Sequence, residues 1–202
     1  MGALGALFLH YSDLIPCQAD IAQAFQLLAS SFRSGGKLLV CGNGGSAADS
    51  EHIVGELMKG LCSAALSPPA CARGCWPPAQ PTASTLPAIS LVSQTSLLSA
   101  FANDVAADMA YAQQVYGYGR AGDAVWGIST SWNAANVIHA LQVGRALGLH
   151  TLGLTGRSGG AMLPFCDVAI RVPADVTPDI QERHLAIYHA LCLMLEQEFF
   201  TS

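Results

Sequence analysis

The sequence of 202 residues contains few charged side chains, since Asp, Glu, Lys and Arg together make up only 11% of it. Its nine basic residues form no cluster and its formal net charge is −5, so it offers no positive surface of the kind that binds nucleic acid. A chain that is also 51% hydrophobic has too little charged surface to cover a monomer well. We therefore expect buried contacts between subunits and no nucleic-acid partner.

Targeting signals are also lacking. The first residues, MGALGALFLHYSD, have no basic n-region and no clear cleavage site, and their apolar run is too short to span a membrane. Position 6 is Ala, where a myristoylation signal requires Ser or Thr. We expect no membrane partner and a cytoplasmic protein.

The glycine-rich signature at 42–46 is neither a Walker A loop nor a GxGxxG fingerprint, so ATP and NAD are poorly supported. The seven cysteines of the chain include a group, Cys62, Cys71 and Cys75, without zinc-finger spacing or a fourth ligand. This group falls in a proline-rich stretch, 60–86, that we interpret as an irregular loop. The other four have apolar or periodic neighbours and are expected to be reduced core residues, which fits a reducing cytoplasm. They are Cys17, Cys41, Cys166 and Cys192.

A glycine-rich turn, Gly42–Ser46, separates an apolar run from a helix expected from about Ala47. Glycine lets the backbone approach a ligand closely, and the amides of a new helix point at an anion or a sugar oxygen. On that helix His52 and Glu56 are four residues apart and therefore share one face. The pattern indicates an active site. The alternative is a simple bend with a solvated His–Glu pair.

A second polar turn, Ser129-Thr130-Ser131, follows the apolar run 124–128 and precedes a helix expected at about 133–147. Three hydroxyls with nearby amides can hold a phosphate, although hydroxyls before a helix are also ordinary N-caps. Short apolar strands alternate with helices along the chain, which predicts a parallel sheet covered on both faces. Both turns follow strands, so we expect them to share one site at the carboxyl edge of the sheet. The last helix, about 179–198, is apolar enough to be buried.

Several motifs in a fixed order give the chain a family resemblance. The set resembles the sugar isomerase (SIS) domain, and within it the phosphoheptose isomerases, from about residue 14 to the end, apart from 60–86. The resemblance implies a single SIS domain over 1–202, with an N-terminal helix at about 14–34. It also implies a three-layer αβα sandwich with a five-stranded parallel sheet, flavodoxin-like, assembled as a homotetramer with sites between subunits. The motifs are CGNGGSAADSEHIVGEL, LPAISL, AND, GISTSWNAANV, LGLTGRSGG, CDVAIRVP and IQERHLAIYH.

The activity implied by the resemblance is conversion of sedoheptulose 7-phosphate to D-glycero-D-manno-heptose 7-phosphate through an enediol(ate). Glu56 and His189 would be the catalytic base and acid. One zinc ion per subunit would be held by His52, Glu56, Gln181 and His189, and positions 181 and 189 do point to one side of a helix. His184 is expected to be a satisfied or partly exposed histidine. The substrate would contact Asn43, Gly44, Gly45, Ser46, Asn103, Asp104, Ser129, Thr130, Ser131 and Gln181.

Two positions depart from the family pattern, whose loop usually reads STSGN and is often followed by Ser. Here Trp132 replaces the glycine and Ala134 lacks the hydroxyl. The indole either swings outward or covers the pocket mouth. The alternative to an enzyme is a non-catalytic SIS protein that binds a phosphosugar as a regulator, or binds a protein partner. The retained His52, Glu56, Gln181 and His189 favour the enzyme, whereas Trp132 favours the binder.

Overall fold

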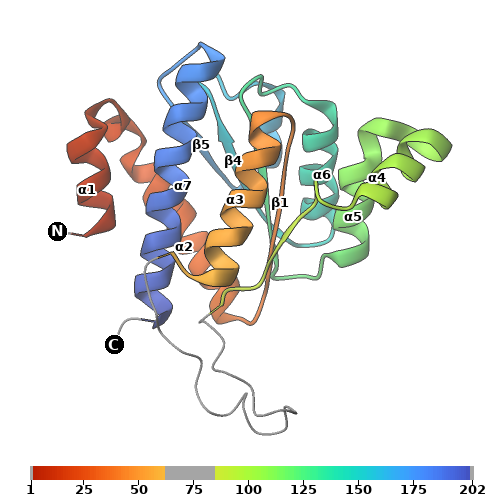
Figure 1. The fold of residues 1–202 in the computed structure, drawn as a ribbon, viewed down its shortest axis with the longest axis horizontal. Coiled ribbons are helices and arrows are strands. Elements are labelled where there is room, and N and C mark those ends of the chain that lie inside the picture. The colour runs from red at the N-terminus through yellow and green to blue at the C-terminus, as the bar shows by residue number, and fades with distance from the viewer. Residues whose placement is uncertain (1, 62–84, 201–202) are drawn as a thin grey trace, which may run out of the picture.

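The computed structural model describes residues 2–61 and 85–200, which fold around a five-stranded sheet (Figure 1). All neighbouring strands are parallel, in the order β2-β1-β3-β4-β5. The predicted parallel sheet is therefore confirmed. The strands are β1 (Leu38–Gly42), β2 (Ala88–Ser90), β3 (Ala124–Ser129), β4 (His150–Thr155) and β5 (Val168–Arg171).

Helices cover both faces of this sheet. Successive strand side chains point to opposite faces, so Leu38 and Val40 join the cluster under α2, α3 and α7, while Leu39 and Cys41 join the one under α5 and α6. This arrangement confirms the three-layer αβα sandwich. The helices are α1 (Ala3–His10), α2 (Gln18–Arg33), α3 (Gly45–Lys59), α4 (Thr95–Phe101), α5 (Ala110–Tyr118), α6 (Ala135–Ala146) and α7 (Thr177–Phe200).

Some predicted boundaries are wrong by a few residues. The N-terminal helix was expected from about 14, but Ser12–Cys17 forms a 3-10 turn and α2 begins at Gln18. Pro16 lies in that turn and has no N–H to donate to an α-helix. Asn103 and Asp104 lie in a short π-helix, Ala102–Ala106, into which α4 continues. The cysteine group of the predicted loop 60–86 lies outside the described residues.

Helix α7 packs against α1, α2 and α3, and the buried side chains along it include Ile180, Tyr188 and Leu191. The prediction of a largely buried final helix is confirmed, although Leu185 is 40% exposed. The four cysteines expected in the core are unpaired thiols. Among the described residues, no helix has the length and apolar character to cross a membrane.

Candidate functional site

The glycine-rich turn forms at the carboxyl end of β1, where α3 begins. Gly44 has a φ of 57°, which favours glycine, and the amide of Ser46 donates to the Asn43 carbonyl (3.1 Å). A Cβ on Gly45 would lie 2.2 Å from Nε2 of Gln181, so the missing side chain lets α7 bring its amide against the turn. The turn and Gln181 are therefore neighbours.

Asn43 is held by a partner that the sequence pattern did not single out. Its Nδ2 donates to Oδ1 of Asn136 (2.8 Å), and Asn136 Nδ2 donates back to Asn43 Oδ1 (2.9 Å). The Tyr111 hydroxyl donates to the Gly42 carbonyl (2.8 Å). Since β1 pairs with β3, this amide pair connects the glycine turn to α6, just beyond the Ser129–Ser131 turn. Asn136 can be recognised as the partner of Asn43 only in the folded structure, because strands distant in the sequence pair there.

The Ser129–Ser131 turn is not a helix cap. The amide of Trp132 donates to the Ser129 carbonyl (3.3 Å), and the hydroxyl oxygens of Ser129 and Ser131 are 3.4 Å apart. Helix α6 begins at Ala135, two residues later than expected, and no side chain caps it. The hydroxyls therefore have no capping role and can serve a ligand.

Trp132 takes an unusual backbone conformation, with a φ of +50°; it is the one non-glycine residue with positive φ in the described part of the chain. Its ring lies against the loop after β4, where a Cβ on Gly156 or Gly160 would come within 2.6 or 2.2 Å of indole carbons. The indole is partly buried and packs against both core clusters. It is thus tucked between two loops rather than swung into solvent.

Three potential metal ligands meet on one side of the α3–α7 pair. Nε2 of His52 lies 3.1 Å from Oε1 of Glu56 and 3.4 Å from Nε2 of His189. One ligand atom from each residue lies within 4.8 Å of the other two. The His52–Glu56 pair follows from helical spacing, but His189 reaches it only because α7 packs against α3.

The chemistry of this cluster suits a divalent cation. Oε2 of Glu56 is buried without a hydrogen-bond partner, which is costly unless a positive group joins it. Burial, and then the facing imidazole of His52, lower the pKa of His189 and favour the neutral ring that can bind a metal. Two imidazoles and a carboxylate are an ordinary donor set for zinc.

A second layer of polar side chains surrounds His52. The Tyr188 hydroxyl lies 2.9 Å from Nδ1 of His52 and 3.4 Å from Oδ1 of Asp49. Burial raises the pKa of both Asp49 and Tyr188. Sequence analysis missed these two residues, although Asp49, His52 and Glu56 have the spacing i, i+3, i+7 that places them on one helix face.

Three further residues named from the sequence, besides the polar turns and Gln181, also do not lie with this cluster. Asn103 and Asp104 are exposed and hydrogen-bonded to each other, on a segment that projects with α4 away from α7 (Figure 1). His184 is fully buried, so partial exposure was wrong. Burial lowers its pKa to about 4, partly offset by the backbone of Thr155.

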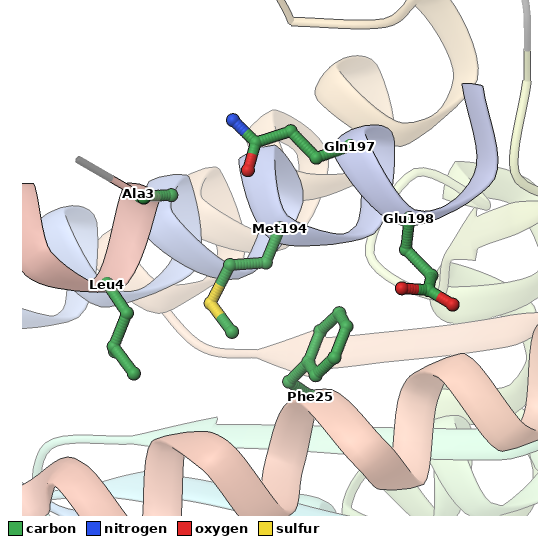
Figure 2. A pocket seen from close by; sticks show the side chains of 7 residues that line it. Ala3, Leu4, Phe25, Met194, Gln197 and Glu198 are labelled. Carbon is green, nitrogen blue, oxygen red and sulfur yellow. The ribbon is translucent and has the colours of Figure 1, made fainter. Parts of the chain in front are cut away.

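Two hollows lie along α1 and α7, and they differ in their relation to the cluster. The pocket in Figure 2 lies between α1, α2 and α7, is lined by Leu4, Phe25 and Met194 among others, and contains no predicted site residue. The other hollow is an apolar groove between α1 and α7 that includes His189 and Leu185 in its lining. One member of the cluster, His189, therefore borders a groove next to α1.

The parallel sheet, the two polar turns and the His–Glu–His cluster together define a SIS-domain protein. A sequence model described as the SIS domain matches residues 16–73. Two solved structures have the same fold. Phosphoheptose isomerase from Neisseria gonorrhoeae aligns with a TM-score of 0.75 and 33% identity, over 96% of this chain and 98% of its own. The enzyme from Francisella tularensis aligns with a TM-score of 0.76 and 30% identity, over 96% and 92%.

Relatives in sequence identify the family within the class of SIS-domain proteins. Phosphoheptose isomerase from Rhodospirillum rubrum is 40% identical over 89% of this chain and 86% of its own. That from Pelobacter propionicus is 41% identical over 93% and 88%. The chain belongs to the phosphoheptose isomerase family, and it is an isomerase.

Proposed function

We propose that this chain converts sedoheptulose 7-phosphate to D-glycero-D-manno-heptose 7-phosphate in the cytoplasm, as one SIS domain per subunit of a homotetramer. The observation that carries the proposal is the convergence of His52, Glu56 and His189 from two helices of an isomerase-family fold. Moving a proton between C1 and C2 requires a base at carbon and an acid at oxygen, and this cluster supplies both kinds of group.

In the proposed reaction the Glu56 carboxylate removes a proton from C1 of the open-chain ketose. His189 donates a proton to O2, which gives the enediol, and then takes the proton from O1 as the C1 carbonyl forms. Glu56 returns its proton to C2, so the enzyme ends as it began.

We propose zinc at His52, Glu56 and His189, with Gln181 as the fourth ligand. A bound zinc ion would polarise the oxygens on C1 and C2 and stabilise negative charge that develops there. The buried, unpartnered Oε2 of Glu56 supports a cation at this position. Within one subunit Gln181 lies two helical turns before His189, about 12 Å along the axis, and its amide is against Gly45, so we propose that it joins the cluster of another subunit together with the polar turns.

The phosphate of the substrate is proposed to bind at Ser129–Ser131, beside Asn43–Ser46. Glu56, however, lies eleven residues along α3 from Gly45, about 16 Å along the helix axis. A single sugar phosphate would have to reach three turns down this helix to touch both regions. We therefore propose that a complete site combines the polar turns of one subunit with the metal cluster of another. Asn103 and Asp104, on the projecting segment, would then contact substrate at such an interface.

Mixing two inactive variants tests the shared site. Subunits carrying Glu56→Gln and subunits carrying the double change Thr130→Ala/Ser131→Ala are unfolded together, refolded and assayed. If sites are shared, mixed tetramers contain some sites with both regions intact, and activity returns. If each site lies within one subunit, every site keeps one defect and no activity returns, which would refute the shared arrangement. Light scattering on the parent protein should give the mass of a tetramer.

The activity itself is tested by a coupled assay with sedoheptulose 7-phosphate and with hexulose phosphates. We expect turnover of the heptulose phosphate and much slower turnover of the hexulose phosphates. Binding of the heptulose phosphate without any turnover, by the zinc-loaded protein, would instead support a non-catalytic phosphosugar-binding regulator.

A further inference from the structure

Tyr188 has a position that the proposed reaction does not explain. Its side chain is 1% exposed, and its hydroxyl contacts polar side chains of α3 from α7. Core packing alone would be served by phenylalanine. The hydroxyl instead lies between Nδ1 of His52 and the carboxylate of Asp49.

In the hydrogen-bonded series Asp49, Tyr188 and His52, the chemistry of Asp49 determines which group donates each hydrogen bond. An ionised Asp49 only accepts hydrogen bonds, so the Tyr188 hydroxyl donates to it. The hydroxyl oxygen then accepts from His52, which places the imidazole proton on Nδ1. The other nitrogen, Nε2, keeps its lone pair and faces Glu56 and His189.

An opposing contact makes this orientation necessary. Oε1 of Glu56 lies 3.1 Å from Nε2 of His52 and is itself an acceptor, so it attracts the same proton to Nε2. A proton there would occupy the lone pair that a metal ion needs. The two carboxylates, Asp49 through Tyr188 on one side and Glu56 on the other, therefore compete for one hydrogen.

We propose that Tyr188, anchored by Asp49, is a positioning residue that holds the proton of His52 on Nδ1 and so presents Nε2 to a divalent cation shared with Glu56 and His189. The inference rests on the proposed metal centre and adds to it a residue outside the ligand set. Partners that orient ligating histidines in this way typically contribute 10–100-fold to metal affinity.

The test compares Tyr188→Phe with the parent and with Tyr116→Phe. The first change removes only the hydroxyl, while Tyr116 is 67% exposed and serves as the matched control. Zinc affinity is measured on each purified, metal-stripped protein by competition with a chromophoric chelator. We expect Tyr188→Phe to weaken zinc binding by 10–100-fold and Tyr116→Phe to leave it unchanged. Asp49→Asn should weaken it in the same direction.

Two further readouts separate positioning from damage to the fold. Nitrogen NMR of the metal-free proteins should show that the His52 proton moves from Nδ1 toward Nε2 in Tyr188→Phe. Excess zinc should restore most of the isomerase activity of that variant, which a distorted fold would not allow.

The outcomes distinguish this inference from the function on which it rests. If the parent binds zinc and Tyr188→Phe binds it equally well, the positioning role is refuted while the metal centre stands. If the parent binds no zinc at micromolar concentration, the metal centre fails and this inference fails with it. Weakened binding with an unchanged His52 tautomer would also overturn the proposed role.

Discussion

The strained backbone at Trp132 allows a sharp prediction about stability. With φ at +50°, this residue occupies a conformation that costs an L-residue roughly 1–2 kcal/mol, whereas glycine adopts it without that cost. The indole offsets the strain by packing against Gly156 and Gly160. Replacing the side chain by glycine or by alanine removes the same packing, but only glycine also removes the strain.

The magnitudes follow from partial burial. Truncating a fully buried Trp costs about 3–5 kcal/mol, so a partly buried ring should be worth about 2 kcal/mol. Trp132→Ala should lose about that amount. In Trp132→Gly the relieved strain outweighs the greater freedom of glycine in the unfolded chain, about 0.4–1 kcal/mol. The glycine variant should therefore be more stable than the alanine variant by roughly 0.5–1 kcal/mol. At about 2–4 °C per kcal/mol, its melting temperature should be higher by about 1–4 °C.

Urea and thermal unfolding at one protein concentration measure this difference. The matched control is Gln26, an exposed residue within α2, where alanine should be more stable than glycine by about 1 kcal/mol. If alanine is also the more stable residue at 132, the strain is not real and the reasoning fails. Phosphosugar affinity should not improve in Trp132→Gly, because the ring packs against the loop after β4. A several-fold gain in affinity would show that the indole restricts the site after all.

Three further predictions concern the cluster and the core. Glu56→Gln should abolish isomerisation while fold and oligomer persist, since an amide cannot accept the proton; near-parent turnover would exclude Glu56 as the base. Elemental analysis should find zinc in the parent and lose it in the double variant His52→Ala/His189→Ala; equal content would exclude the site. His184, with its pKa lowered to about 4, binds a proton more readily when unfolded, so stability should fall as pH drops from about 6.5 to 4. The free energy of unfolding of His184→Leu and of the parent is compared with a chelator present. Its loss between pH 6.5 and 4 should be smaller in the variant by on the order of 3 kcal/mol, and an equal loss in both proteins would contradict the lowered pKa of His184.

Much of the fold was predictable because it depends on local patterns. Strand and helix positions followed from the spacing of apolar residues, and their alternation indicated a parallel sheet with helices on both faces. Boundaries were less certain, since Pro16 and the continuation of α4 depend on local hydrogen bonds that apolar spacing does not encode. The His52–Glu56 pair was likewise visible, because residues four apart on a helix must share a face.

The tertiary structure decided what joins these local pieces. Asn136 contacts Asn43 only because β1 pairs with β3. The Trp132 indole packs against the segment after β4 only because that segment has glycine at positions 156 and 160. Sequence spacing carries no information on such contacts, which depend on how distant elements pack.

For this protein, then, the sequence by itself determined the class of fold and the His52–Glu56 pair, because helical and strand periodicity act over a few residues, and its ordered motifs indicated the family. Only the packing of α7 against α3 brought His189 to His52 and placed Tyr188 between His52 and Asp49. Residues more than 130 positions apart become neighbours through burial of apolar helix faces, and that burial is a property of the whole core rather than of any local stretch.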